Sequence, residues 1–193
     1  MTALTFAATV SAGNPFFETF KTPHQTFPFS EIKSEHYLPA FEEAIKQHNK
    51  EVDDIINNPQ APTFENTIVA LENSGKMLNK VSAPFYNLLS SETTDELQKI
   101  AEQISPVMSE HSNAVRLNEK LFARVKAVYE QKDKLNLNTE QKMLLKESYD
   151  GFADNGANLS EADKVTYRQL TKDISLLTLV YGQNVLKETN KYS

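Results

Sequence analysis

Four histidines are the residues in this sequence best suited to metal or acid–base chemistry, and they are His24, His36, His48 and His111. None of them begins an HExxH motif, in which two histidines one helical turn apart bind zinc and the intervening glutamate activates water. His48 and Glu51 are three residues apart and could share one face of a helix. One imidazole–carboxylate pair is too small for a zinc site, which needs three protein ligands and a water. We therefore interpret His48 as a partly buried helical histidine, and we expect no catalytic, cofactor-binding or metal-binding residue in the chain.

Other catalytic motifs are missing as well. No GxSxG nucleophile elbow occurs, and Ser90-Ser91 is expected in a turn. The sequence has no cysteine, which excludes thiolate chemistry and disulfides. Residues 151–156 contain two glycines, but no strand precedes them and no lysine follows, so we expect a helix end and not a phosphate site. We assign the carboxylate pairs to exposed helix faces or to first turns, where they suit the helix dipole: Glu42-Glu43 and Glu161/Asp163.

The composition is that of a soluble globular protein, with 39% hydrophobic and 24% charged residues among 193. The net charge is −6, and no run rich in Lys and Arg provides the basic patch of a nucleic-acid-binding protein. No apolar run reaches the roughly 18 residues that a membrane-spanning helix requires. We therefore expect neither nucleic acid nor membrane as a partner.

The first twelve residues differ from the rest of the chain. Residues 2–12 carry no charge, and Val10-Ser11-Ala12 resembles the small-residue cleavage site of a secretory signal. The basic segment that should precede such a signal is missing. We expect residues 1–12 to be a truncated signal peptide of a periplasmic or exported protein. An unstructured tail on a cytoplasmic protein is the alternative.

Residues 13–35 predict an extended arm, because closely spaced prolines prevent a long helix. The arm also carries five phenylalanines, which need burial. We therefore expect the arm to lie on the surface of the helical domain with these rings packed against it: Phe16, Phe17, Phe20, Phe27 and Phe29.

Residues 36–193 predict an all-α fold built from helical hairpins, because apolar residues recur at steps of three and four. Helix caps are expected at Thr63 and Ser160, a capping box from Thr93 to Glu96, and a left-handed helix end at Gly156. Pro84 should kink or end its helix, and Pro106 should kink another. The expected helices are 36–56, 63–83, 93–129, 140–153 and 160 to the C-terminus.

The last expected helix is apolar around more of its circumference than one stripe requires. An exposed apolar patch usually marks an interface. If the chain is one part of a larger protein, we expect this helix to pack against the remainder and the isolated chain to self-associate or aggregate through it, at Leu176, Leu177, Leu179, Val180 and Tyr181.

Three ordered segments resemble the zinc metallopeptidase family of thimet oligopeptidase, oligopeptidase A and peptidyl-dipeptidase, most of all its peptidyl-dipeptidase branch. Residues 29–45 resemble the family's entry into its first long helix, and residues 62–72 its second helix start. Residues 155–159, with the helix that continues to 182–186, resemble the region ahead of the catalytic half.

The resemblance implies an all-helical, two-lobed peptidase that encloses a channel for short peptides and releases C-terminal dipeptides. Residues 36–193 would be its helical N-terminal domain, part of one lobe, with the remainder of the same peptidase as partner. Zinc would be bound by an HExxH helix and a later glutamate, far beyond Ser193, so the chain alone is expected to be inactive. The alternative is a stand-alone helical interaction or ligand-binding module without catalysis.

Overall fold

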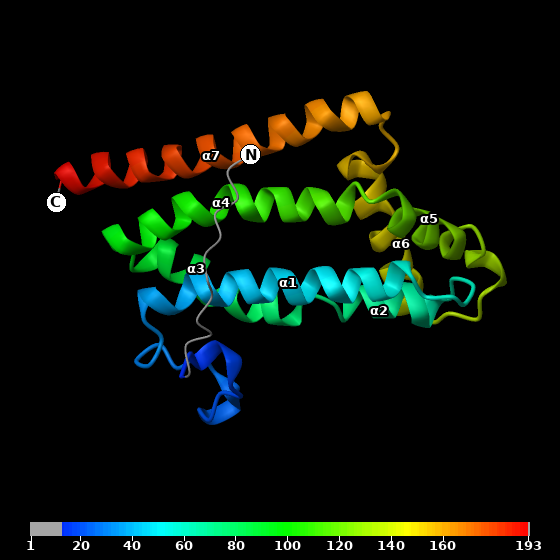
Figure 1. Cartoon of the computed structure of the whole chain (residues 1–193), viewed down its shortest axis with the longest axis horizontal. Helices are drawn as coiled ribbons and strands as arrows, with labels where there is room; N and C mark the ends of the chain where they lie inside the picture. Colours follow the sequence, from blue (N-terminus) through cyan, green and yellow to red (C-terminus); the bar gives the residue numbers. More distant parts are fainter. Residues whose placement is uncertain (1–12, 193) are drawn as a thin grey trace.

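α1 (Tyr37–Ile56) is the helix around which most of the chain packs. The computed structural model describes residues 13–192, and these residues form helices and turns but no strand. α1 contacts α3 (Lys76–Ser91) and α4 (Asp95–Arg116). Figure 1 shows α7 (Glu161–Thr189) as a further layer that runs along α4. The predicted all-α fold is confirmed.

Shorter elements connect and extend these helices. η4 and η6 are π-helical, and the other η elements are 3₁₀ turns. In chain order they and the remaining α-helices are η1 (Pro15–Phe17), η2 (Pro23–Gln25), η3 (Ser34–His36), η4 (Phe64–Val69), α2 (Ala70–Glu72), α5 (Glu119–Tyr129), η5 (Lys132–Lys134), α6 (Thr139–Phe152), η6 (Ala153–Ala157) and η7 (Asn190–Tyr192).

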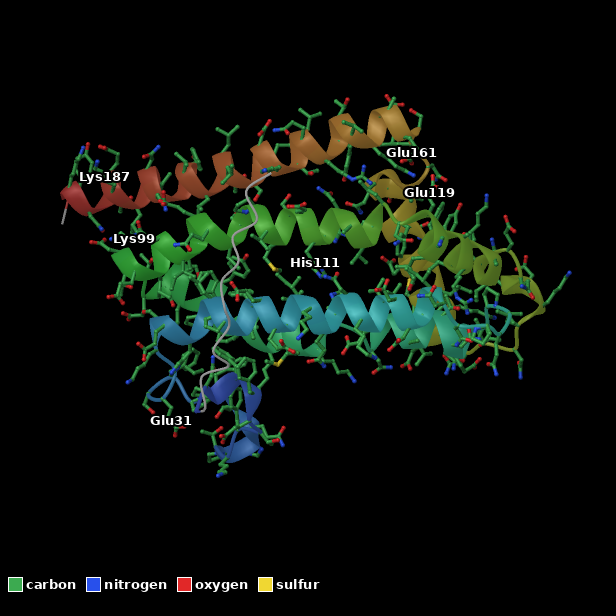
Figure 2. All side chains as sticks on the ribbon, in the orientation of Figure 1. Glu31, Lys99, His111, Glu119, Glu161 and Lys187 are labelled. Atoms are coloured by element: carbon green, nitrogen blue, oxygen red, sulfur yellow. The ribbon has the colours of Figure 1, made fainter. Side chains whose placement is uncertain are left out.

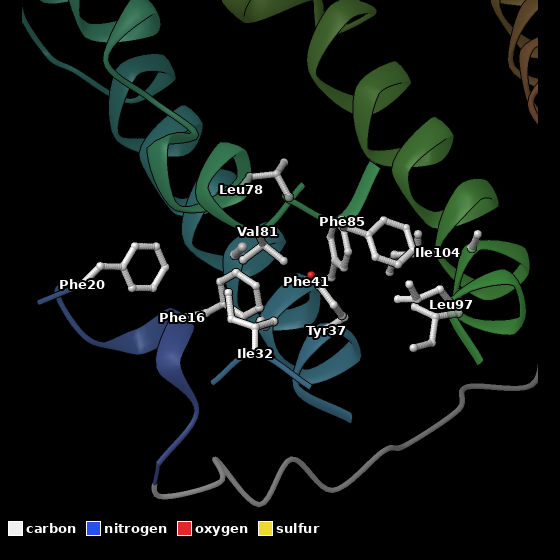
Figure 3. Packing of buried hydrophobic residues seen from close by; sticks show 14 residues of the cluster. Phe16, Phe20, Ile32, Tyr37, Phe41, Leu78, Val81, Phe85, Leu97 and Ile104 are labelled. Atoms are coloured by element: carbon white, nitrogen blue, oxygen red, sulfur yellow. The ribbon is translucent and has the colours of Figure 1, made fainter. Parts of the chain in front are cut away.

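The first hydrophobic core joins the N-terminal arm to α1, α3 and α4 (Figure 3). At its centre, the Phe85 ring lies 5.0 Å from the Tyr37 ring and 5.3 Å from the Phe41 ring, centroid to centroid. Phe16 of the arm lies 5.3 Å from Tyr37. Aromatic pairs at such distances add about 0.5–1.5 kcal/mol to the gain from burial. Packing of these rings therefore holds the arm on the helices.

The predicted burial of the arm's phenylalanines is confirmed for Phe16 and Phe20 and wrong for Phe29, which is 46% exposed. Lys80 of α3 stabilises the buried end, because its Nζ donates a hydrogen bond to the Phe16 carbonyl at 2.7 Å and lies 4.2 Å from the Phe20 ring centroid. Phe29 follows Pro28 in a turn, and its ring lies 6.0 Å from the Phe27 ring, centroid to centroid.

A second hydrophobic core surrounds the C-terminal half of α1. α5, α6 and the two π-helical segments supply its other side chains. Its largest members are Ile55, Phe64, Ile68, Leu121, Phe122, Leu145 and Phe152. α1 therefore serves both cores, the first with its N-terminal half and the second with its C-terminal half.

The helix expected over 63–83 is divided in the structure. The helix is interrupted at Gly75, whose φ of +68° is left-handed, and α3 begins directly after it. Pro84 does not end α3, so Ser90 and Ser91 lie in the last turn of a helix and not in a turn between elements. A proline in a helix interior costs about 3 kcal/mol. Burial of the apolar face of α3, Pro84 included, offsets this cost.

The helix expected over 93–129 is also two helices, α4 and α5. The first begins one residue later than predicted, because the Thr94 hydroxyl caps it by accepting a hydrogen bond from the first turn. Glu96 is therefore the second helical residue, and the predicted capping box does not form. α4 continues through Pro106, and the side chain of Asn118 then caps α5 as a separate helix.

The other predicted helix ends are confirmed. The hydroxyls of Thr63 and Ser160 each accept a hydrogen bond from the N–H three residues later. Gly156 has a φ of +90° and ends the turn after α6. A Cβ at this position would lie 2.9 Å from Leu159 Cδ1, so glycine is required by both its dihedral and its surroundings.

Substitution of Phe85 tests the first core. Phe85 is fully buried between Tyr37 and Phe41, so Phe85→Ala should lower the free energy of unfolding by about 3–5 kcal/mol. Phe29→Ala removes the same side chain from an exposed position and should cost less than about 1 kcal/mol. Urea unfolding followed by circular dichroism measures both, and equal losses would contradict the assignment of Phe85 to the core centre.

Candidate functional site

His48 of α1 and His111 of α4 form a hydrogen-bonded pair between the two cores. His48 Nδ1 lies 2.9 Å from His111 Nε2, and the ring centroids are 4.9 Å apart. Figure 2 shows His111 in the space between α4 and α1. His111 is 6% exposed and His48 is half-buried. The two imidazoles form a polar layer where α1 passes from the first core to the second.

The partners of this pair fix its tautomers. The Ser74 hydroxyl donates its hydrogen to the Leu71 carbonyl at 2.6 Å, so it accepts from His48 Nε2–H at 3.2 Å. His48 Nδ1 is then an acceptor, and His111 Nε2–H donates to it. His111 Nδ1 remains as a buried acceptor with no partner among the described residues.

Glu51 and Gly75 complete the layer. Glu51 Oε2 accepts a hydrogen bond from the Gly75 N–H at 2.7 Å, which ties the start of α3 to α1. A Cβ at Gly75 would lie 3.2 Å from the His48 ring. The spacing of His48 and Glu51 does place both on the same face, as predicted, but the carboxylate binds a backbone N–H.

Burial keeps both imidazoles neutral. Desolvation lowers the pKa of His48 below its ordinary value, and the Glu51 carboxylate opposes the change. Desolvation also lowers the pKa of His111, and a charge on His48 would lower it further. Two neutral rings can share one N–H···N bond, whereas two imidazolium ions would face each other with two donors.

The residues of this layer do not fit a zinc ion. The facing nitrogens of His48 and His111 bind each other, and Glu51 binds Gly75. Within residues 13–192, no group of three or more His, Asp and Glu side chains is arranged to hold a metal. The expectation that zinc is bound elsewhere in an intact family member stays a prediction.

The partnership of His48 with His111 was not predicted from the sequence. The two residues are 63 positions apart, and each occurs on its own helix without a local motif. One signal was available: each histidine falls on the apolar stripe of its helix and should be buried. Because a buried imidazole needs a hydrogen-bond partner, the two could have been expected to pair.

A groove of about 490 Å³ lies between α3, α4 and the C-terminal half of α7. Leu89, Leu179 and Leu186 give it apolar walls, and the Ser105 and Ser175 hydroxyls, 2.6 Å apart, lie at one side. No Asp, Glu, Lys, Arg or His lines it within the described part of the chain. The groove can bind an apolar group, and among its described lining residues the Tyr86 hydroxyl is the one group that could exchange a proton.

Lys164 fastens the start of α7 to the start of α5. Its side chain is 2% exposed, and its Nζ lies 2.8 Å from Glu161 and 3.0 Å from Glu119. Figure 2 shows Glu119 and Glu161 near each other where the two helices begin. The hydrogen bond to Glu161 is the main reason that the pKa of Lys164 is raised. Glu161 and Asp163 lie in the first turn of α7 as predicted, but Glu161 also bridges two helices.

The glycine-containing segment 151–156 is a helix end, as predicted. Gly151 lies inside α6, and η6 follows it. Asn155 Oδ1 accepts a hydrogen bond from Arg116 Nη1 at 2.8 Å, which connects this end to α4. None of the helices of residues 13–192 is long and apolar enough to cross a membrane.

Comparison with known proteins finds relatives that are peptidases. No protein-family model matches the sequence. Dipeptidyl carboxypeptidase of Escherichia coli (strain K12) is 38% identical over 173 residues, and the Salmonella typhimurium protein of the same name is also 38% identical. Oligopeptidase A of Haemophilus influenzae is 28% identical over 180 residues. These matches cover 90–93% of this chain but only 25–26% of each relative, so the chain spans about a quarter of their length.

Over almost its whole length the helical chain is therefore similar to a part of these peptidases. The matches confirm the expected resemblance to the thimet oligopeptidase and peptidyl-dipeptidase family. The identity is higher with the dipeptidyl carboxypeptidases, at 38%, than with the oligopeptidases A, at 28%.

The His48–His111 pair should make stability fall as pH drops. Because burial lowers both pKa values, the unfolded chain, whose histidines titrate near 6.5, takes up protons at a higher pH than the folded chain. The contribution of the pair to the free energy of unfolding is complete above pH 6.5 and decreases as pH falls toward the folded pKa values. Urea midpoints at about pH 7.5 and about pH 5 measure this loss before most carboxylates titrate.

Two single variants assign the loss to the pair. His111→Gln keeps a donor for His48 but cannot be protonated, so it should cost about 1 kcal/mol at neutral pH and lose less on acidification. His24→Gln removes an exposed histidine and should behave like the wild type. An equal pH-dependent loss in the wild type and in His111→Gln would contradict the role of the pair.

Proposed function

We propose that the chain is the non-catalytic part of a zinc metallopeptidase that releases dipeptides from the C-terminus of short peptides. The observation that carries this proposal is 38% identity to dipeptidyl carboxypeptidases over 90% of the chain. Its 193 residues contain no HExxH motif. The zinc ligands and the glutamate that activates water would therefore belong to residues outside this chain.

The packing of these helices favours a structural role for the chain over a catalytic one. Two hydrophobic cores and the hydrogen-bonded layer of His48 and His111 give a wall of packed helices. Within residues 13–192, the Tyr86 hydroxyl is the one titratable group that lines the groove beside α7, and burial raises its pKa. Such a wall can shape a channel for peptides, while the bond-breaking groups come from the rest of the enzyme.

Peptide hydrolysis tests the assignment of the chemistry. The 193-residue chain with added zinc should release no dipeptide from an N-blocked tripeptide. The full-length gene product should release the C-terminal dipeptide, and a chelator should stop it, because the metal polarises the scissile carbonyl. Mass spectrometry identifies the products. Chelator-sensitive hydrolysis by the 193-residue chain would contradict the proposal.

A stand-alone helical interaction or ligand-binding module is the second candidate, and the uncharged groove of about 490 Å³ is the observation that favours it. The two candidates differ in the DNA that follows the codon for Ser193. An open frame that encodes HExxH supports the peptidase. A stop codon with no such frame downstream supports the module.

We also propose that the protein is exported to the periplasm after cleavage near Gly13. Residues 1–12 lie outside the described part of the chain, so the proposal depends on their uncharged composition and on Val10-Ser11-Ala12. N-terminal sequencing of the native protein from its host should find a chain that starts near Gly13. A chain that retains residues 1–12 in the cytoplasmic fraction would contradict export.

A further inference from the structure

α7 carries an apolar ridge on the side that faces away from α4. The members of this outer ridge follow one another at steps of four, three, four and four residues, which places them on one side of the helix. They are 47–71% exposed. At 1.5 Å per residue the ridge is about 22 Å long. The outer ridge consists of Leu170, Ile174, Leu177, Tyr181 and Val185.

This exposure confirms the apolar character predicted for α7. Leu177, Val180 and Tyr181 are exposed, whereas Leu176 and Leu179 are half-buried. Among the 29 residues of α7, Lys164 alone is buried. In Figure 1 α7 is the outermost helix.

Hydrogen bonds between polar side chains connect α7 to α4. Asn113 Nδ2 donates to Thr171 Oγ1 at 2.7 Å, and the Ser105 and Ser175 hydroxyls lie 2.6 Å apart. Farther along, the Gln183 amide donates to Glu102 at 3.2 Å. A surface helix normally turns its apolar stripe to the core and its polar side to water. α7 turns Leu179 toward the first core, but its outer ridge stays exposed and has no partner among the described residues.

We propose that the outer ridge of α7 is the docking surface for an amphipathic helix from the downstream part of the same polypeptide. The inference rests on the proposed function. A ridge with steps of three and four residues fits the groove of another helix, in which side chains of the two helices interdigitate. A helix of about four turns would cover it.

Two observations favour a downstream helix over a separate protein. The dipeptidyl carboxypeptidases are about four times as long as the matched region, since the chain spans 25% of their length. Beside the ridge, Thr171, Thr178 and Asn184 are uncharged and Asp173 is charged. Charged residues at such positions set partner choice in separable coiled coils, whereas permanent interfaces resemble the inside of a domain.

The test introduces one charge at two positions of α7, in two lengths of chain. Leu177→Lys places the charge on the ridge, where 67% of the residue is exposed in the 193-residue chain. Gln169→Lys places the same charge at an exposed position away from the ridge. In the 193-residue chain both variants should unfold within about 1 °C of the wild type, because exposed substitutions change stability little.

In the full-length gene product the two variants should differ in melting temperature. Leu177→Lys should lower the melting temperature by several degrees, because the charge is now buried against the docked helix, and Gln169→Lys should not. The proposal is overturned if the full-length Leu177→Lys protein has the same melting temperature as the full-length wild type. It is equally overturned if no polypeptide follows Ser193, or if sedimentation shows that the full-length protein pairs through this ridge with a second copy.

Peptidase activity of the full-length wild type separates this proposal from the proposed function. If the full-length wild type releases dipeptides but Leu177→Lys does not lower the melting temperature, the proposed function is supported and the docking site is contradicted. If Leu177→Lys lowers the melting temperature but the full-length wild type has no peptidase activity, the docking site is supported and the proposed function is contradicted.

Discussion

The arrangement of these helices depends on one buried hydrogen bond, between His48 of α1 and His111 of α4. Both hydrophobic cores use α1, and the pair lies where one core ends and the other begins. A buried N–H without an acceptor costs about 1–3 kcal/mol, so a shift of α4 along α1 is penalised even where apolar packing alone would tolerate it. Glu51 and Gly75 extend the constraint to α3, because the N–H of Gly75 is held while its missing Cβ makes room for the His48 ring.

α7 depends on this frame but is not held in the same way. Lys164 fixes its first turn, and hydroxyl and amide contacts align it on α4. Hydrogen bonds of this kind contribute about 1 kcal/mol each, and they do not bury the apolar stripe that usually stabilises a helix. The proposed place of the chain in a longer peptidase explains the arrangement, because further polypeptide would cover the other side. The frame of α1, α3 and α4 is stabilised by its own buried core, whereas α7 is proposed to need a partner on its outer side.

Local signals in the sequence predicted the fold class and several helix ends. Thr63 and Ser160 cap helices through the N–H three residues later, so the cap and its partner lie within one short window. The break at Gly75 was not predicted, because a single glycine in a helical pattern is tolerated and its cause, the His48 ring, is 27 residues away. The His48–His111 bond and the groove beside α7 were missed for the same reason. Each joins segments that are far apart in the sequence, and no local sequence motif indicates that packing brings them together.

Amide hydrogen exchange tests the central claim most directly, namely that α7 is an interface helix of a larger peptidase. Exchange would be compared between the 193-residue chain and the full-length gene product, with the amides of α1 as the internal reference. In the 193-residue chain the central amides of α7 should exchange at least about tenfold faster than those of α1, and in the full-length protein this difference should largely disappear. Equal protection of α7 and α1 in the 193-residue chain, unchanged in the full-length protein, would contradict the account.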